Sequence, residues 1–185
     1  MNTLSKKIIS LAEPVSIRRI LLFTIIFIFT ELVFSMLIIP AVKASSGGYG
    51  ILDSLFMADK AHYRSLMNAY TSETRLLHYV SSSLDMLFPL IYGGLMAMLL
   101  IRCVGNKRWL SPALLLVLIT VVADYLENAG ILFFISMHRE AGEGVISYLQ
   151  ITSNLKFIFL GFSILITGFA IGRSLFSQKK KGVKQ

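Results

Sequence analysis

The chain contains four long apolar stretches, and about twenty apolar residues are what a helix needs to cross the hydrocarbon core of a membrane. They run from about Ile20 to Ala41, from Leu84 to Ile101, from Ala113 to Met137 and from about Thr152 to Gly172. Because a backbone in lipid must satisfy its polar groups internally, these stretches predict an all-α protein. We expect one membrane domain over residues 17–176, a four-helix bundle with four spans, because 185 residues leave no room for a separate soluble domain.

Composition and charge agree with a membrane protein. Hydrophobic residues make up 55% of the chain and charged residues 15%. The net charge of +8 comes from Lys and Arg near the ends of the apolar stretches, which indicates a topology signal and argues against nucleic-acid binding. Cys103 is the single cysteine, which excludes an internal disulfide, a dithiol redox centre and a multi-cysteine metal site. We predict no cofactor and no metal.

Basic residues precede the first stretch, fill the connection between the second and third, and end the chain. The positive-inside rule therefore places both termini in the cytoplasm, and we expect the cell membrane. Residues 1–16 are predicted to be an interfacial amphipathic leader and residues 177–185 a basic cytoplasmic tail. A cleaved signal peptide is the alternative for the first stretch, since Val42 and Ala44 are small. The apolar run is longer than in such peptides and contains Glu31, which favours a retained span.

Residues 42–83 form the long connection on the outer side. After a glycine-rich start, apolar and aromatic residues recur every three or four positions, which predicts two short amphipathic helices over the outer mouth of the bundle. The segment Thr71-Ser72-Glu73-Thr74 is predicted to break the run and to supply the N-cap of the second helix. Arg75 and Tyr79 follow on one face of it. We expect them to anchor at the interface or, alternatively, to guide an anionic head group.

Acidic residues inside the apolar stretches are the main functional signal. At a rise of ~1.5 Å per residue, Glu31 and Asp124 both lie ~16 Å from the cytoplasmic ends of their spans, and Glu127 lies ~21 Å deep. An ionisable group at such depth costs at least ~2.5 kcal/mol, so it is expected to face a protein interior. Asp124, Glu127 and Glu31 are accordingly the predicted catalytic residues.

Each span carries polar residues along one helical face, and these faces are expected to line a shared interior. Three deep carboxylates face one deep lysine there, so the surplus must take up protons or bind a cation. The predicted ligand-binding residues are Asp85, Tyr92, Asn128, Lys156 and Arg75.

Three functions fit this pattern, and the sequence does not decide whether the protein is an enzyme. The first is binding of a lipid-like or otherwise amphipathic small molecule in an intrabundle pocket lined by carboxylates, with acid-assisted chemistry on it and membrane lipids as partners. The second is a small proton- or cation-coupled transporter subunit, which we expect to form a homo-oligomer. The third is a non-catalytic membrane assembly subunit whose polar interior holds the helices together.

Overall fold

The computed structural model describes residues 15–104, 107–137 and 140–182, and every regular element in them is a helix. The all-α prediction is thus confirmed. Four helical rods are long and apolar enough to cross a membrane, which indicates a membrane protein. The rods are Ile17–Ser45, Ser72–Cys103, Arg108–Met137 and Glu143–Phe176. The predicted leader, apart from its last two residues, and the side chains of the predicted basic tail lie outside the described residues.

The first rod consists of α2 (Ile17–Val33), a π-helical turn (Phe34–Ile38) and α3 (Ile39–Ser45). Pro40 explains the wide turn. Proline has no N–H, and in a regular α-helix its ring would press on the carbonyl four residues earlier. In the π-helical turn, the Ile39 N–H bonds instead to the carbonyl of Phe34, five residues back.

The second rod joins α5 (Ser72–Asp85) to α6 (Phe88–Cys103), with a break where Pro89 begins α6. Thr71, in the segment predicted to supply it, is the N-cap of α5, and its side chain accepts from the Thr74 N–H at 3.1 Å. The two predicted amphipathic helices exist, but only α4 (Lys60–Ala69) lies beyond the spans. The second helix, α5, continues into a spanning rod because only two residues separate it from α6.

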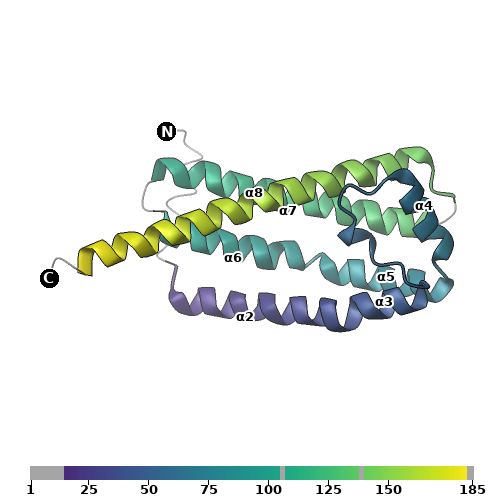
Figure 1. Ribbon diagram of the computed structural model, residues 1–185, viewed down its shortest axis with the longest axis horizontal. Coiled ribbons are helices and arrows are strands. Elements are labelled where there is room, and N and C mark those ends of the chain that lie inside the picture. Colours follow the sequence, from purple (N-terminus) through teal and green to yellow (C-terminus); the bar gives the residue numbers. More distant parts are fainter. Residues whose placement is uncertain (1–14, 105–106, 138–139, 183–185) are drawn as a thin grey trace.

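The last two rods are α7 (Lys107–Met137) and α8 (Glu143–Gly182). Successive rods run in opposite directions, so α2 begins and α8 ends at the same end of the molecule (Figure 1). We call this the terminal end, and we call the opposite end, with α4 and residues 46–59, the loop end. Glu143, in the first turn of α8, forms ion pairs with Lys60 and Arg64 of α4, and the buried residues Tyr63, Leu66 and Met67 hold α4 at this end.

The interior has apolar packing at both ends. Each apolar cluster is built from residues of several helices. The loop-end cluster contains Val42, Ile51, Leu52, Tyr63, Leu66, Met67, Tyr70, Ile131, Phe134, Ile135, Ile146 and Leu149. The terminal-end cluster contains Leu100, Leu110, Ala113, Val117 and Ala170. On α7 and α8, the buried residues between these clusters are mainly polar.

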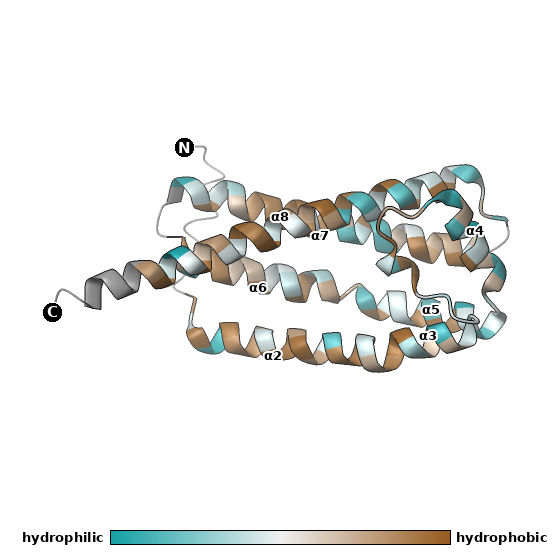
Figure 2. Cartoon of the chain, in the orientation of Figure 1, coloured by the Kyte–Doolittle hydropathy of each residue, from teal (hydrophilic) through white to brown (hydrophobic). Residues whose placement is uncertain are grey.

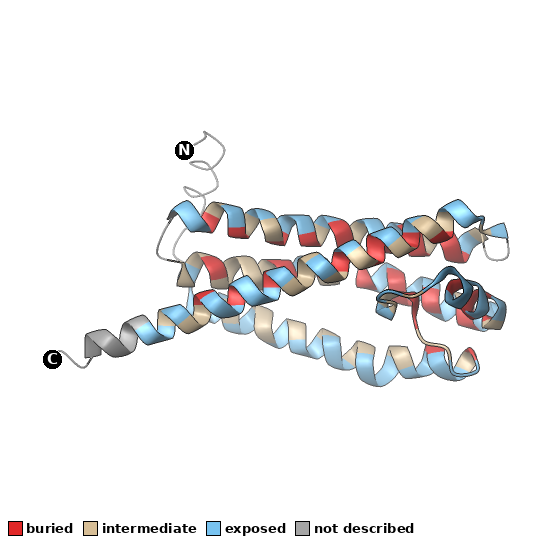
Figure 3. Cartoon of the chain, turned by 45° about the horizontal axis from the view of Figure 1, so that its top comes forward, coloured by how far each residue is buried: buried red, intermediate tan, exposed pale blue. Residues whose placement is uncertain are grey.

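The rods differ in how much of each is buried. Figure 3 shows red, buried positions along α7 and α8, whereas α2 has no buried residue. Hydrophobic residues cover most of α2 all the same, as Figure 2 shows. This helix packs on α6 through Phe88, whose ring lies 5.5 Å from that of Phe27 and 6.4 Å from that of Phe34. Thus α2 lies at the periphery of the protein and is attached to α6 by contacts between aromatic rings.

Candidate functional site

The polar interior is centred on Lys156 of α8. Its Nζ lies 3.5 Å from Oδ1 of Asp124 and forms a second ion pair with Oε2 of Glu127. The two acids lie one turn apart on α7, so both reach the same ammonium group. All three side chains are less than 10% exposed. The sequence placed these residues at similar depths, and the structure brings them together.

Two hydrogen bonds extend this group to the second rod. The Tyr92 hydroxyl on α6 donates to Oδ2 of Asp124 at 2.8 Å, and Nδ2 of Asn128 donates to Oδ2 of Asp85 at 3.0 Å. Asp85 is the last residue of α5 and also interacts electrostatically with Asp124. Four of the five predicted ligand-binding residues therefore lie in this cluster.

The sequence analysis missed a fourth carboxylate. Asp53 comes from the connection between the first two rods, yet its charge acts on Lys156 and Asp124. Its Oδ1 is buried and has no hydrogen-bond partner among the described residues. Burial raises the pKa of Asp53, and the nearby Lys156 opposes that rise. A single acid, followed by Ser54, among the apolar residues of 51–57 was the available signal.

Asp53 is held in place by residues 50–58, which we call the strap. The strap is bound to α8 by three side-chain hydrogen bonds to its backbone, and it covers part of the loop end (Figure 1). The bonds join Ser153 Oγ to the Leu55 carbonyl at 2.7 Å, Asn154 Oδ1 to the Met57 N–H at 2.9 Å and Gln150 Nε2 to the Ala58 carbonyl at 2.8 Å.

Charge in this cluster is strongly unbalanced. Asp53, Asp85, Asp124 and Glu127 meet one ammonium group, that of Lys156, so full ionisation would leave an excess of three negative charges. Both oxygens of Glu127 are buried, and the cation that faces them is the ammonium group of Lys156. Each uncompensated buried ion costs several kcal/mol, so a buried excess of this size must be neutralised.

Two predicted site residues lie elsewhere. Glu31 is exposed on α2, and the prediction that it shares the interior is wrong. Depth along a helix fixes the level of a side chain but not which rods its helix contacts, and α2 packs mainly on α6. Arg75 is half-buried on α5, ten residues before Asp85 and therefore ~15 Å from it along the helix axis.

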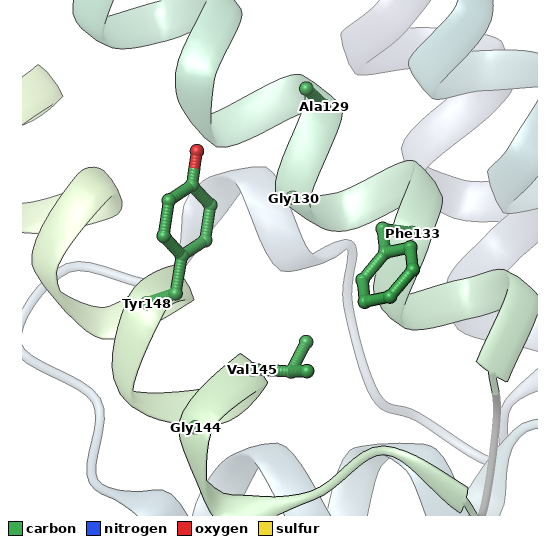
Figure 4. Close-up of a pocket in the computed structure, with 6 residues that line it drawn as sticks. All are labelled: Ala129, Gly130, Phe133, Gly144, Val145 and Tyr148. Carbon is green, nitrogen blue, oxygen red and sulfur yellow. The ribbon is translucent and has the colours of Figure 1, made fainter.

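A separate apolar groove of about 370 Å³ lies between α7 and α8 near the loop end. Figure 4 shows Phe133 and Tyr148 on its two sides, and the Tyr148 hydroxyl donates to the Leu126 carbonyl at 2.9 Å. No predicted ligand-binding residue lines the groove. The remaining lining residues are Ala129, Gly130, Gly144 and Val145.

The described residues contain no group of three or more His, Cys, Asp or Glu side chains arranged to hold a metal ion. No family model, curated protein or solved structure matches this chain, so the cluster of Asp53, Asp85, Asp124, Glu127 and Lys156 has to be interpreted from its own chemistry.

Proposed function

We propose that this is a small proton-coupled membrane transport subunit whose buried carboxylates bind and release protons. The observation that carries the proposal is the charge imbalance around Lys156, whose ammonium group contacts Asp124 and Glu127 and also interacts electrostatically with Asp53 and Asp85. A site that must hold protons to remain buried changes its charge when those protons leave. That property is what coupling to a proton gradient requires.

The position of the cluster supports the same function. It lies between two apolar clusters, with the terminal-end cluster of Leu100, Leu110, Ala113, Val117 and Ala170 on one side. The strap, bound to α8, carries Asp53 on the other side. The protein would therefore act as a four-span bundle in the cell membrane with cytoplasmic termini, because basic residues precede the first rod and follow the last. The loop end would then face outward.

Infrared spectroscopy of the full chain in lipid nanodiscs tests the proposal directly. As pH is raised, the carbonyl band of protonated carboxylic acids should disappear in wild-type protein. We expect part of that band to be missing in Asp85→Asn and in Glu127→Gln. Glu73→Gln is the matched control, because Glu73 is exposed in the first turn of α5 at the loop end, and it should leave the band of the buried acids in place.

The other outcomes are equally informative. A wild-type protein with no such band at neutral pH, in sodium-free buffer, contradicts the proposal. Displacement of the protons by added sodium but not by choline would show that the cluster binds a metal cation in competition with protons. If Asp124→Asn combined with Glu127→Gln does not assemble at any pH, the carboxylates hold the helices together and the protein is a structural subunit.

The apolar groove favours a second candidate function, which is binding of a lipid-like or amphipathic molecule. Its volume of about 370 Å³ lies within the range of small-ligand sites, and its lining suits an acyl chain. A spin-labelled phospholipid tests this function. It should be immobilised by wild-type protein and released by Gly144→Leu, which fills the groove from a position where nothing lies within 4 Å of the added Cβ. Equal immobilisation by both proteins would contradict the second function and leave the proton-binding proposal untouched.

A further inference from the structure

The buried face of α5 is made entirely of polar residues. Its buried positions are Thr74, His78, Ser81, Ser82 and Asp85, and its exposed positions include Leu76, Leu77, Val80 and Leu84. This is the reverse of the pattern in a water-soluble helix. Apolar residues on the outside suit a lipid environment, but a wholly polar inner face requires partners inside the protein.

Hydrogen bonding fixes the tautomer of His78, which is fully buried. The hydroxyl of Tyr70 donates its single hydrogen to the Gly50 carbonyl at 2.9 Å and lies 2.8 Å from Nδ1 of His78. For both contacts to be hydrogen bonds, Nδ1 must carry a proton and donate to the Tyr70 oxygen. Nε2 is then an unprotonated base. It is buried and has no hydrogen-bond partner among the described residues.

Polar atoms between His78 and the carboxylate cluster also lack hydrogen-bond partners among the described residues. Ser82 lies one turn beyond His78, and its buried Oγ has no hydrogen bond within the described ranges. Asp85 lies one turn beyond Ser82 and accepts from Asn128, whose own Oδ1 is buried and unpaired there as well. From His78 to Asp85 the helix rises only ~10 Å. Buried polar atoms without a protein partner are the groups that internal water satisfies in proteins.

We propose that the polar face of α5 is a water-lined proton path between the loop end and the carboxylate cluster, and that Nε2 of His78 relays protons along it. The inference rests on the proposed function. A hydronium ion gives its proton to the Nε2 lone pair, and the imidazolium returns it to a water beside Ser82. That water passes a proton to the carboxylate of Asp85, and His78 is restored.

The surroundings of His78 suit a relay that does not store charge. The titratable or charged groups near it are Tyr70 at the end of α4, Arg75 and Asp85 on its own helix, and Asp53, whose charge acts on Tyr70. Burial raises the pKa of Tyr70, so the phenol keeps its proton and Nδ1 keeps its acceptor. No ion pair to His78 is found in the described part of the chain. A proton on Nε2 therefore has no fixed partner to hold it.

The test follows proton uptake by the cluster in time. Full-length protein in lipid nanodiscs receives a light-triggered pH jump from a caged proton, and the infrared band of the protonated carboxylic acids is recorded. We expect His78→Ala to slow uptake by about 100-fold or more, the lower end of what a positioned proton-transfer group contributes. The equilibrium midpoint of the band should stay unchanged. Added imidazole should restore the rate in His78→Ala but leave the wild-type rate unaffected.

Two further variants make the outcome decisive. Ser82→Ala removes one hydroxyl from the path and should slow uptake without abolishing it, and it serves as the deciding variant if His78→Ala does not fold. His62→Ala is the matched control, because His62 is exposed on α4 and should leave the rate as in wild type. Uptake at the wild-type rate in both His78→Ala and Ser82→Ala overturns the path and leaves the proposed function standing. If wild-type protein shows no titrating band, both are overturned.

Discussion

The hydroxyl of Tyr92 on α6 donates to Oδ2 of Asp124 on α7 at 2.8 Å, while Oδ1 of the same carboxylate lies 3.5 Å from Nζ of Lys156 on α8. One side chain thus links three helices. Asp124 is held from one side by a neutral donor and from the other by a cation, which fixes its position among the four acids of the cluster.

Replacing Tyr92 by Phe removes the donor and keeps the ring. We expect a loss of about 1–3 kcal/mol in the free energy of unfolding, because a buried carboxylate oxygen then has no partner. Chemical unfolding in detergent micelles measures the change. Tyr79→Phe on the exposed face of α5 is the control and should have almost no effect. Equal stability of the two variants would show that the hydrogen bond does not contribute.

Removal of the ammonium group should be more damaging. Lys156→Met leaves Asp124 and Glu127 buried without their cation, and we expect a loss of about 3–5 kcal/mol in unfolding free energy near neutral pH. Adding Glu127→Gln to this variant should recover part of the loss, because one uncompensated charge is gone. Lys43→Met, at an exposed position of α3, is the matched control. A double variant no more stable than Lys156→Met would contradict this account.

Docking of the strap should depend on pH. Because burial raises the pKa of Asp53 above its ordinary 3.8, the folded chain holds a proton where the unfolded chain has lost it. The stability that this group contributes is complete below the unfolded pKa and falls as pH rises through the folded value. Hydrogen-exchange protection factors of residues 51–58 should therefore decline above pH 3.8 in wild type. Asp53→Asn should remove this decline. Asp59→Asn, which keeps an N-cap on α4, should not.

The hydrogen bond between Asn154 and the Met57 N–H can be tested by proteolysis. Asn154→Ala removes the acceptor, and a loss of about 1 kcal/mol should make the strap open roughly five-fold more often. Chymotrypsin cleavage at Phe56, which is exposed, reports that opening. Asn68→Ala on the exposed side of α4 should be cleaved at the wild-type rate. If both variants are cleaved alike, the bond does not hold the strap.

Gly130 allows α7 and α8 to approach closely. A Cβ at this position would lie 2.6 Å from Cε1 of Tyr148 and 2.9 Å from Cδ2 of Leu149. The Tyr148 ring is held by its hydrogen bond to Leu126, so Gly130→Ala should cost about 1–3 kcal/mol in unfolding free energy. Gly161→Ala is the control, since nothing lies within 4 Å of the added methyl group, and it should be neutral or stabilising. Equal stability would mean that the helices separate freely.

The sequence was sufficient to predict the spans and the centre of the site. Helical period and depth were enough to predict that Asp124, Glu127 and Lys156 lie together, because an ionisable residue in an apolar span is expected to face the protein interior. Glu31 is at the right level on α2, but its exposure depends on the aromatic attachment of Phe27 and Phe34 to α6, which no periodicity reveals.

The same argument could not predict the position of Asp53, because this residue lies outside the spans. Its position depends on tertiary hydrogen bonds from α8 to the backbone of the strap, nearly one hundred residues later in the chain. The start of α8 was also placed too late, at Thr152 instead of Glu143, because its first two turns are less hydrophobic than the span that follows.

The order of the cluster along the chain has a consequence for synthesis. Asp53, Asp85, Asp124 and Glu127 are all made before Lys156, so the nascent chain must place its buried acids in or beside the membrane before their cation exists. Until α8 arrives, those acids have no internal counter-charge in the ion pairs described here. Insertion of α8 is therefore the step that completes the ion pairs between the rods. A chain released before residue 156 would lack them, and we expect it to be degraded.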